Sequence, residues 1–454
     1  MGLDVEAVVE RAESRGLTHV HLGMFDSHGH LMVKRYHVAN LRKSLTEGVR
    51  MVSAILAAAA SGVEMVGTHA LADPDGQFRD GLLRMDPASC RDFPLEADGR
   101  GMLLIGEFVD DTRAWCSRAL LSDELARLRD LGYEAVGALE LESVALAETA
   151  RSLAAKSARA LELRTGYGHP YQLVAEPADL AFLTELNAVC ESMDVALDSQ
   201  HPELMHLLET SLRPDVGVRI ADNAALYKNV AKVLARRHGF MMSFMARWHP
   251  EQQGCGAHFN VSLTRADDGR PVFFDPEGRD GVADELRWFV GGLHAYLPEL
   301  FALLAPNVNS YKRFVPGLFT PLNNTWGIDN KTVAHRVLVS TAASARVETR
   351  LAGADVSPHL GLLAVLLAGR TGIAERREPP PPVSGNGWAV EDLPGPPLPL
   401  RMEDAIGALE ASALARNNLG GSFVEAFVSD RRWQLERFGR AVTDWELQMY
   451  AEGG

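Results

Sequence analysis

Cysteine is scarce in this sequence, because the 454-residue chain contains only four, Cys90, Cys116, Cys190 and Cys255. They stand singly, and no two of them have the C-x-x-C spacing of a zinc or redox motif. This argues against a disulfide-stabilised secreted fold and against a cysteine-based zinc site. The pattern favours a reducing compartment, and we expect a cytoplasmic protein.

Positive charge is also in short supply, since 45 Lys and Arg residues face 60 Asp and Glu residues, giving a formal net charge of −15. No polybasic run stands out, so nucleic acid and anionic membrane are poor partners for this chain. Long apolar runs are missing too. The longest, Val52 to Ala60, is too short to span a bilayer, and the acidic N-terminal segment does not resemble a secretory signal. We expect no nucleic-acid partner and no membrane partner.

The composition is that of an ordinary folded protein, with 46% hydrophobic and 23% charged residues. A chain of this length suits two or three structural units. Residues 18–31 alternate apolar and polar around a Ser-His-Gly turn, which predicts a two-stranded hairpin after a helix. The turn-rich segment 72–77 and a weak strand at 103–111 complete a small mixed domain that we expect to end near residue 112.

The pattern changes after Ser122, where apolar residues at helical spacing lead to Gly132, a predicted helix C-terminus. The segment EAVGALELES, residues 134–143, then predicts a strand. Longer helices are predicted at about 176–193, 221–239 and 283–305. The proline-rich stretch 379–399 fits neither a helix nor a central strand, and we interpret it as a surface excursion that only connects elements.

Acidic and imidazole side chains recur at spacings that put them on one face of a strand. Glu140 and Glu142 are two residues apart and would point the same way. His201, Glu203 and, six residues later, Glu209 follow another strand-like segment. Each pattern alone has an ordinary explanation, since E-x-E is common on a solvated strand face and a lone His is usually structural.

Two further segments supply polar residues at a spacing of two. In GCGAHFNVSL, residues 254–263, two glycines precede a strand that carries on one face His258, Asn260 and Ser262. In RVETR the alternating charges are Arg346, Glu348 and Arg350. Oxygen donors with imidazole suit Mg²⁺ or Mn²⁺, and guanidinium groups suit phosphate and carboxylate oxygens. Together these segments predict ATP-driven activation of a carboxylic acid.

The order of these motifs resembles that of the glutamine synthetase family over nearly the whole chain: GALELES, HPE with a later Glu, GCGAHFNVSL, NSYKRFVPG, WGIDNKTVAHRV and RVETRLAGADVSPHL. The resemblance implies an α+β fold. Residues 1–112 would form an N-terminal β-grasp domain. Residues 113–454 would form a glutamine synthetase-type catalytic domain, in which helices flank an antiparallel sheet funnel.

The resemblance also implies the chemistry. Members of the family bind ATP and two or more Mg²⁺ or Mn²⁺ ions, phosphorylate the γ-carboxylate of glutamate, and let an amine displace the phosphate. The implied metal ligands are Glu140, Glu142, Glu203, Glu209, His258 and Glu348.

The substrate and nucleotide contacts are carried over in the same way. Arg313, in NSYKR, would bind the α-carboxylate of glutamate, and Arg350 would steer its γ-carboxylate. Beside the substrate and the amine, the family motifs match Gln253, which stands where Asn is usual, Gly254 and Tyr171. The implied nucleotide and phosphate contacts are Asn260, Ser262, Lys331, Arg336 and Arg346. Lys331 replaces the usual Arg, which keeps the charge but loses the bidentate fork.

Two family carboxylates that attract ammonium have no counterpart here. Val52 aligns with the Asp of a D-G-S-S segment that reaches in from the neighbouring subunit, and Phe319 stands at the acid of the flap after NSYKR. Leu207 and Leu208 replace a Gly-Gln pair. Apolar groups cannot replace the water around ammonium. They do suit the hydrocarbon part of a larger amine, at about 0.8 kcal/mol for each buried CH₂.

We therefore expect a ligase that joins glutamate, or a close analogue, to an organic amine other than ammonia. Glutamine synthetase proper and a non-catalytic scaffold or regulatory member are the alternatives. The residues expected to decide catalysis and amine choice are Arg313, Arg336, Arg350, Phe319 and Val52. The family also implies a homo-oligomer of two stacked six-membered rings with sites shared between subunits. The sequence leaves open the amine, the acyl donor and the physiological metal.

Overall fold

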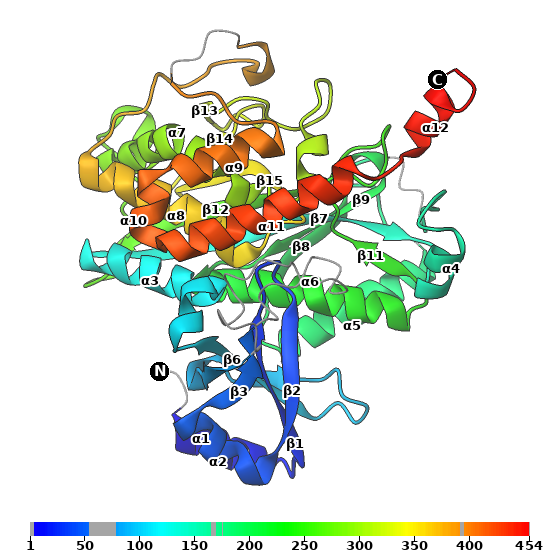
Figure 1. The fold of residues 1–454 in the computed structure, drawn as a ribbon. Helices are drawn as coiled ribbons and strands as arrows, with labels where there is room; N and C mark the ends of the chain where they lie inside the picture. Colours follow the sequence, from blue (N-terminus) through cyan, green and yellow to red (C-terminus); the bar gives the residue numbers. More distant parts are fainter. Residues whose placement is uncertain (1–3, 54–78, 165–168, 175, 391–394, 454) are drawn as a thin grey trace.

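The computed structural model describes residues 4–53, 79–164, 169–174, 176–390 and 395–453, and the turn predicted at 72–77 lies outside them. The chain forms two sheets, a small one near the N-terminus and a large one that carries most of the helices (Figure 1). This is the predicted α+β class. In the described part of the chain, every helix is too short or too polar to cross a membrane.

The N-terminal sheet has the strand order β2-β1-β6-β4-β3, and a short β5 pairs with β6. Its strands are β1 (His19–Phe25), β2 (Leu31–His37), β3 (Val49–Val52), β4 (Asp80–Met85), β5 (Arg91–Phe93) and β6 (Gly101–Phe108). Its helices are α1 (Val5–Ser14) and α2 (Leu41–Glu47). β1 is antiparallel to β2 and parallel to β6, a mixed arrangement consistent with the predicted β-grasp domain.

The predicted N-terminal hairpin is confirmed, but its second strand continues to His37. Asp26 shapes the turn, because its Oδ1 accepts hydrogen bonds from the backbone N–H groups of His28 and His30 at 2.9 and 2.8 Å. Gly29 follows with a φ of +80°, a conformation that glycine adopts without strain. The hairpin tip contacts α6, described below, where the Asn229 side-chain amide donates to the Gly29 carbonyl at 2.9 Å.

The large sheet has the order β13-β14-β15-β12-β7-β9-β8, with short β10 and β11 also paired to β7. Its strands are β7 (Tyr133–Leu146), β8 (Leu197–Pro202), β9 (Leu207–Leu212), β10 (Asp215–Val216), β11 (Met241–Ser243), β12 (Gly256–Arg265), β13 (Trp326–Ile328), β14 (His335–Leu338) and β15 (Arg346–Gly353). All neighbours on this path are antiparallel except β13 and β14. The strand predicted at 134–143 is the long central β7.

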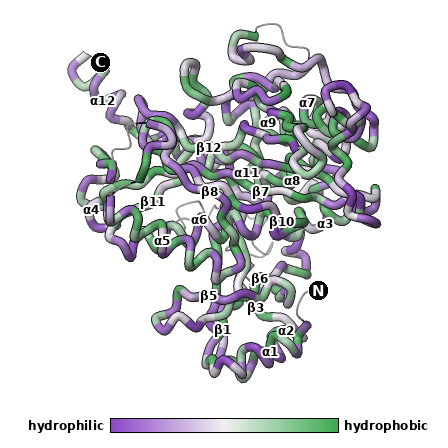
Figure 2. Tube along the Cα trace, turned by 180° about the vertical axis from the view of Figure 1, so that it is seen from behind, coloured by the Kyte–Doolittle hydropathy of each residue, from purple (hydrophilic) through white to green (hydrophobic). Residues whose placement is uncertain are grey.

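Helices cover this sheet and form the main core with it. They are α3 (Ser117–Asp130), α4 (Ala150–Ala155), α5 (Pro177–Ser192), α6 (Arg219–Arg237), α7 (Asp284–Leu304), α8 (Pro358–Glu375), α9 (Met402–Ala411), α10 (Ala413–Leu419), α11 (Gly421–Gly439) and α12 (Asp444–Tyr450). The three long predicted helices correspond to α5, α6 and α7. α7 and α8 carry many apolar residues (Figure 2). Gly292 lets the two helices pack closely, since a Cβ at this position would lie only 2.1 Å from the Ala368 carbonyl oxygen.

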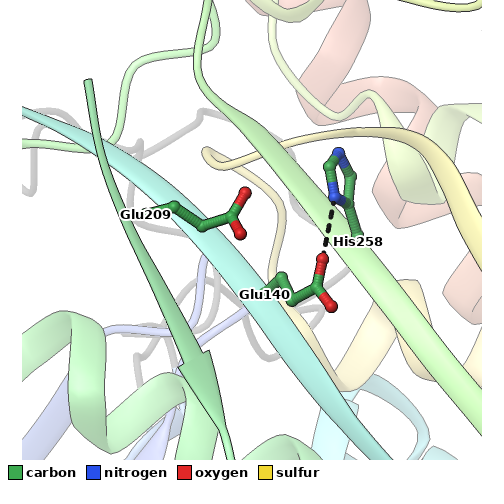
Figure 3. Close-up of side chains that lie close together, drawn as sticks. All are labelled: Glu140, Glu209 and His258. Atoms are coloured by element: carbon green, nitrogen blue, oxygen red, sulfur yellow. Dashed lines mark hydrogen bonds and ion pairs between the residues drawn. The ribbon is translucent and has the colours of Figure 1, made fainter. Parts of the chain in front are cut away.

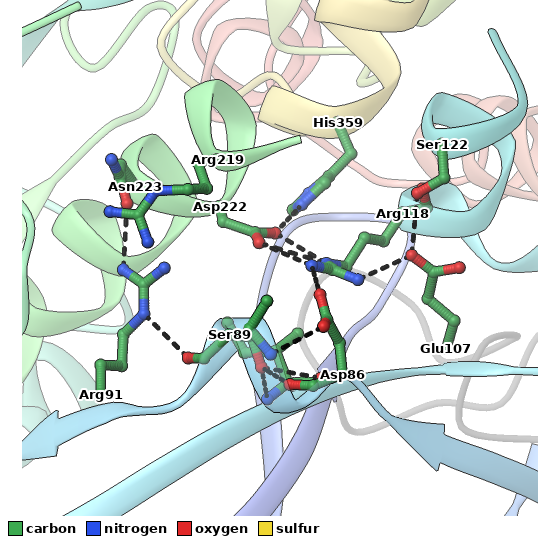
Figure 4. A network of polar contacts seen from close by, with 12 residues as sticks. Asp86, Ser89, Arg91, Glu107, Arg118, Ser122, Arg219, Asp222, Asn223 and His359 are labelled. Atoms are coloured by element: carbon green, nitrogen blue, oxygen red, sulfur yellow. Dashed lines mark hydrogen bonds and ion pairs between the residues drawn. The ribbon is translucent and has the colours of Figure 1, made fainter. Parts of the chain in front are cut away.

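A buried charge network joins the two sheets (Figure 4). Arg118 on α3 binds Asp222 of α6 through Nε and Nη2, both at 3.1 Å, and reaches Glu107 of β6 at 2.7 Å. Asp222 also contacts His359 of α8 at 2.8 Å, and Arg118 contacts Asp86 at 3.0 Å. Both hydrophobic clusters use residues from either side of position 112, so the domain boundary there stays a prediction.

The proline-rich stretch is fastened to the large sheet instead of merely connecting elements. In its described part it has no α-helix or strand, as predicted, and one 3-10 turn at Gly387–Ala389. The Trp326 indole donates to the Pro380 carbonyl at 2.7 Å, and the Gly387 N–H donates to Thr332 Oγ at 2.7 Å. The prediction of a bland connection is wrong, because these bonds hold the stretch, including Trp388, against the β13–β14 region of the large sheet.

Candidate active site

Strand register aligns the predicted ligands across the large sheet. Along β8, β9 and β7, His201 pairs with Glu209, and Glu209 pairs with Glu142. On the other edge of β7, Glu140 pairs with His258 of β12. Paired residues of antiparallel strands point to the same face, and so do residues two apart on one strand. All five side chains therefore rise from one face of the sheet.

The same face continues over β15 and β14. Asn260 pairs with Glu348, and Glu348 pairs with Arg336. Arg346 and Arg350 flank Glu348 at a spacing of two on β15. The alternating charges of the RVETR segment thus face the acidic cluster and not the solvent.

Three predicted metal ligands converge at the centre, where Glu140, Glu209 and His258 point toward one another from β7, β9 and β12 (Figure 3). One ligand atom from each lies within 4.8 Å of the other two. His258 Nδ1 is 3.2 Å from Glu140 Oε2 and 3.3 Å from Glu348 Oε1. An imidazole nitrogen among carboxylate oxygens is a donor set that suits Mg²⁺ or Mn²⁺.

Glu209 also belongs to a second group, with His201 and Glu203. His201 Nε2 is 3.4 Å from Glu209 Oε1, and His201 Nδ1 is 3.5 Å from Glu203 Oε1. The hydrogen bond with Glu209 raises the pKa of His201. The Tyr171 ring lies against His201 with 4.5 Å between centroids. His201 was not among the six implied ligands, although its position two residues before Glu203 was a signal that could have found it.

Glu142 borders these groups through Gly256, the second of the two glycines that precede the predicted strand. The backbone N–H of Gly256 donates to Glu142. A Cβ on Gly256 would lie 3.2 Å from Glu142 Oε2 and from His258 Nε2, and 2.7 Å from Arg313 Nη2. Only glycine lets an acid, an imidazole and a guanidinium meet at this point.

Negative charge exceeds positive charge at the centre of the site. Glu348 is held by Arg336 at 3.0 Å and by Arg350. Among the residues that the structure describes, no Lys or Arg forms an ion pair with the other four carboxylates, Glu140, Glu142, Glu203 and Glu209. Burial alone would raise the pKa of Glu140, but the hydrogen bond and charge of His258 and the charge of Arg350 lower it. Ionised carboxylates at this spacing fit a divalent cation.

Two buried guanidinium groups lie beside the carboxylates. Arg313 is 2% exposed and Arg350 is 5% exposed, and the Nε of each lacks a hydrogen-bond partner in the described structure. Arg313 Nη1 donates to the Leu351 carbonyl at 3.2 Å. Burial lowers the pKa of Arg313, while the charge of Glu142 opposes that shift. Buried guanidinium donors of this kind suit substrate carboxylates, so the geometry supports the predicted roles of both residues.

Gln253 and Gly254 link this region to the flap that follows Arg313. Gln253 Oε1 accepts the backbone N–H of Phe319 at 3.3 Å, and the Gln253 N–H points to Met205 Sδ at 3.1 Å. A Cβ on Gly254 would lie 3.2 Å from Arg313 Cγ, so glycine allows close contact with the arginine. The structure thus places Gln253 next to Phe319 and Gly254 next to Arg313.

The flap carries an aromatic pair above Arg350. The Arg350 guanidinium carbon is 5.8 Å from the centroid of the Phe319 ring. Trp388 meets Phe319 edge to face, with 5.1 Å between centroids and 80° between planes. Sequence reasoning missed Trp388, because nothing local predicts that the proline-rich stretch folds back onto the flap.

The predicted nucleotide contacts line a cavity of about 370 Å³ beside Glu140. Asn260, Ser262 and Arg346 form part of its wall. Asn260 donates to Glu140 at 3.1 Å, and Arg346 donates to Asn260 at 3.0 Å. Arg336 lies next to this group through its bond to Glu348. A cavity lined by the cation Arg346 and by Glu140, one of the metal-type carboxylates, fits the phosphates of a nucleotide.

Two predicted residues lie apart from the rest. Lys331 is exposed and makes no hydrogen bond or ion pair with any described residue, so the structure does not place it at the nucleotide cavity. Val52 ends β3 in the N-terminal sheet, away from the site of its own chain (Figure 1). Its direct partner across the strands is Asp80, an exposed residue, so a carboxylate stands next to the valine.

The site can now be set beside known proteins. Residues 114–450 match the model of the glutamine synthetase catalytic domain. The chain belongs to the glutamine synthetase family. It is 31% identical over 338 residues to glutamate–isopropylamine ligase of a Pseudomonas species, covering 74% of this chain and 73% of that protein. It is 32% identical over 453 residues to gamma-glutamylethanolamide synthetase of Streptomyces coelicolor, covering 98% of this chain and 95% of that protein.

A solved structure of apo GmaS has the same fold. It superposes with a TM-score of 0.82 at 22% identity and covers 98% of this chain and 99% of that chain. Family membership and this fold confirm the predicted family, the α+β class and the predicted carbon–nitrogen ligase class. The roles of individual site residues stay predictions that the geometry supports.

Proposed function

We propose that this chain is an ATP-dependent ligase that activates the γ-carboxylate of glutamate, or of a close analogue, and joins it to an organic amine. The observation that carries the amine choice is the pairing of Phe319 and Trp388 above Arg350. Edge-to-face aromatic pairs present a broad apolar wall. Such a wall favours the hydrocarbon of an amine and offers ammonium nothing to replace its water.

The site residues divide into three roles under this proposal. Glu140, Glu209 and His258 would hold one divalent ion and His201, Glu203 and Glu209 another, with Glu142 and Glu348 at their borders. Bound Mg²⁺ or Mn²⁺ ions would neutralise the phosphate oxygens of ATP during transfer. Arg346 and Arg336 would orient the nucleotide phosphates.

Arg313 and Arg350 would fix glutamate through the guanidinium donors that the fold leaves unused. Because Arg350 lies under the Phe319 ring, the γ-carboxylate that it steers would sit directly below the aromatic wall. The attacking amine would then enter between the flap and the metal-binding carboxylates, with its carbon chain toward Phe319 and Trp388. We propose small monoamines with a short carbon chain as substrates, in keeping with the isopropylamine and ethanolamide in the two relatives' names.

The test is competition between amines. The full-length enzyme receives MgATP, glutamate, and equal concentrations of ammonium and isopropylamine, and product masses are measured alongside phosphate release. We expect γ-glutamylisopropylamide to exceed glutamine. A product mixture dominated by glutamine would identify the chain as a glutamine synthetase proper. If no amine of a wider panel supports phosphate release, a scaffold role is favoured.

One observation favours the ammonium alternative and can be tested separately. Asp80 stands beside Val52 across β3 and β4, so an acid is present near the position where the family has its Asp. If Asp80 serves ammonium, Asp80→Asn should reduce glutamine formation and leave amide formation from organic amines intact. Under our proposal neither rate changes by more than about twofold, because Asp80 makes no contact with the amine.

A homo-oligomer and a cytoplasmic location complete the proposal. Support for an oligomer comes from α12, which projects away from the rest of the chain (Figure 1). Large apolar side chains are exposed on and near it, at Val442, Trp445, Leu447, Met449 and Tyr450. Such a patch is typical of a surface that another subunit covers.

A further inference from the structure

A second cavity, of about 530 Å³, lies between α6, β11 and the tip of the N-terminal hairpin. None of its lining residues belongs to the metal or nucleotide groups described above. Its volume is in the range of small-molecule sites. The walls combine cations, methionines and one carboxylate, a mixture that packing alone does not require.

Three cations of α6 line this cavity at a spacing of four: Lys228, Lys232 and Arg236. Residues four apart lie on one face of a helix, so the three form a row about 12 Å long. Exposure rises along the row, from buried Lys228 through half-buried Lys232 to exposed Arg236. The row therefore runs from the back of the cavity to its mouth.

These cations have no acidic partners in the part of the chain that the structure describes. Lys228 is 6% exposed, and its ammonium donates only to the Val356 carbonyl, at 2.7 Å. Lys232 makes no hydrogen bond or ion pair with a described residue and lies over the Phe244 ring at 5.7 Å. Arg236 also forms no ion pair with any residue that the structure describes. Buried and half-buried cations without counter-ions are costly, so an anionic ligand is the natural complement.

A buried polar atom points to the same conclusion. His28, in the hairpin turn, lines the cavity and is 7% exposed, and its Nε2 has no hydrogen-bond partner among the described residues. The one acid in the wall is Asp355, whose Oδ2 accepts from Ser310 at 2.6 Å and from Asn307 at 2.9 Å. Asp26 is not part of the cavity lining, and its Oδ2 lies 2.9 Å from His30 Nδ1. Burial lowers the pKa of Lys228, and the charges of Asp355 and Asp26 oppose that shift only in part. Neither carboxylate forms an ion pair with a cation of the α6 row among the described residues.

We propose that this cavity binds a small organic anion with two or more acidic groups, such as a polycarboxylate or a sugar bisphosphate. The ammonium and guanidinium groups would bind the acidic groups along α6, and His28 would donate or accept one further hydrogen bond. Met241, Met242 and Met245 also line the cavity, where flexible thioethers adapt to a carbon skeleton. This site lies outside the ligase chemistry and would regulate it.

The link to the active site is the turn that carries Arg313. Asn307 and Asn309 line the cavity, and Asp355 holds Asn307 and Ser310, three residues before Arg313. An occupant that shifts this turn changes the position of the arginine proposed to bind glutamate. By thermodynamic linkage, glutamate must then change the affinity for the anion by the same factor.

Calorimetry on the full-length protein without divalent metal tests the site independently of turnover. The probes are tricarballylate, with three carboxylates, and fructose 1,6-bisphosphate, each with and without saturating glutamate. We expect saturable binding of at least one probe, and the probe that binds identifies the acidic group. We also expect its Kd to differ between the two glutamate conditions, and identical values would contradict the link to Arg313.

Charge variants on one helix supply the control. Lys232→Gln should weaken binding by about tenfold or more, as expected for loss of a charged hydrogen-bond donor, and exposed Arg236→Gln should weaken it less. Arg237→Gln removes a charge one residue further on, outside the cavity lining, where the guanidinium binds the Leu95 carbonyl. It should leave the Kd within about twofold. Absence of binding by both probes, or equal Kd values for wild type, Lys232→Gln and Arg236→Gln, would overturn the site.

Discussion

Two clusters of charged side chains in this protein have opposite designs. At the junction of the two sheets, the side chains of Arg118 and Asp222 are 4% and 1% exposed and bind each other directly. Arg118 also forms ion pairs with Asp86 and Glu107, so carboxylates of the chain itself compensate its charge. At the active site, four carboxylates converge with imidazoles and amides, and no described Lys or Arg pairs with any of them.

The difference separates charge that holds the fold from charge that awaits a ligand. A buried pair such as Arg118–Asp222 is satisfied by the chain itself, so removal of one partner leaves an uncompensated ion. A group of carboxylates without Lys or Arg partners is fully satisfied only by a ligand from outside, so removal of one member also relieves repulsion among the others. The same kind of substitution should therefore cost much less stability at the metal-type carboxylates than at the junction.

The largest expected effect is on catalysis. Glu140→Gln should lower kcat/KM for amide formation by about 100- to 1,000-fold, the scale for loss of one electrostatic contact to the reacting groups. The melting temperature of the metal-free variant should fall only slightly, because the amide keeps the contact with Asn260 and loses only the charge interactions with His258 and Arg350. A variant that melts well below the wild type without metal would show that Glu140 belongs to the fold and not to a ligand site.

A much larger loss of stability is expected at the junction. Asp222→Asn should lower the free energy of unfolding by about 3–5 kcal/mol, since it leaves Arg118 buried without its main partner. Urea denaturation measures the loss. The control is Asp123→Asn, because the Arg113–Asp123 pair is 37% and 38% exposed and should cost less than about 1 kcal/mol. Equal losses at the two positions would break the distinction between the clusters.

A smaller effect is expected at the apolar wall formed by Phe319 and Trp388, which we propose faces the amine. Phe319→Glu should shift the ratio of ammonium to isopropylamine use by about tenfold toward ammonium, because it restores an anion at the flap. Product masses from mixed amines give the ratio. Val315→Glu adds the same charge to an exposed part of the same loop and should leave the ratio unchanged. A shift of equal size in both variants would count against the position assigned to Phe319.

The smallest effect concerns the second half of the aromatic pair. Trp388→Ala should raise the KM for isopropylamine by about threefold to tenfold, on the scale of one aromatic contact, while the KM for glutamate stays constant. Steady-state kinetics with each substrate in turn measures both values. A change confined to the glutamate KM would mean that Trp388 supports Arg350 instead of the amine.

Much of the metal site follows from the sequence because it rests on strand periodicity. Once Glu140 and Glu142 lie on one strand and His258 on its neighbour, the alternation of side chains dictates that they share a face. His201 was visible in the same pattern but was set aside as a structural histidine. Its contact with Glu209 depends on the register of β8 and β9, which one sequence does not reveal.

The amine side was harder to predict because its parts come from segments without regular structure. Phe319 was found through a family motif, whereas Trp388 reaches it through hydrogen bonds between the proline-rich stretch and the β13–β14 region. The neighbour of Val52 was missed for a similar reason. Asp80 is 28 positions away in sequence, and only the pairing of β3 with β4 brings the two together.

Equilibrium dialysis with Mn²⁺ tests the central claim, that the converging carboxylates form a divalent-metal site, most directly. The account predicts that the wild-type chain binds two or more ions per subunit and that Glu209→Gln, which touches both ligand groups, loses at least one of them. Fewer than one ion per wild-type subunit, or the same number in both proteins, would contradict it.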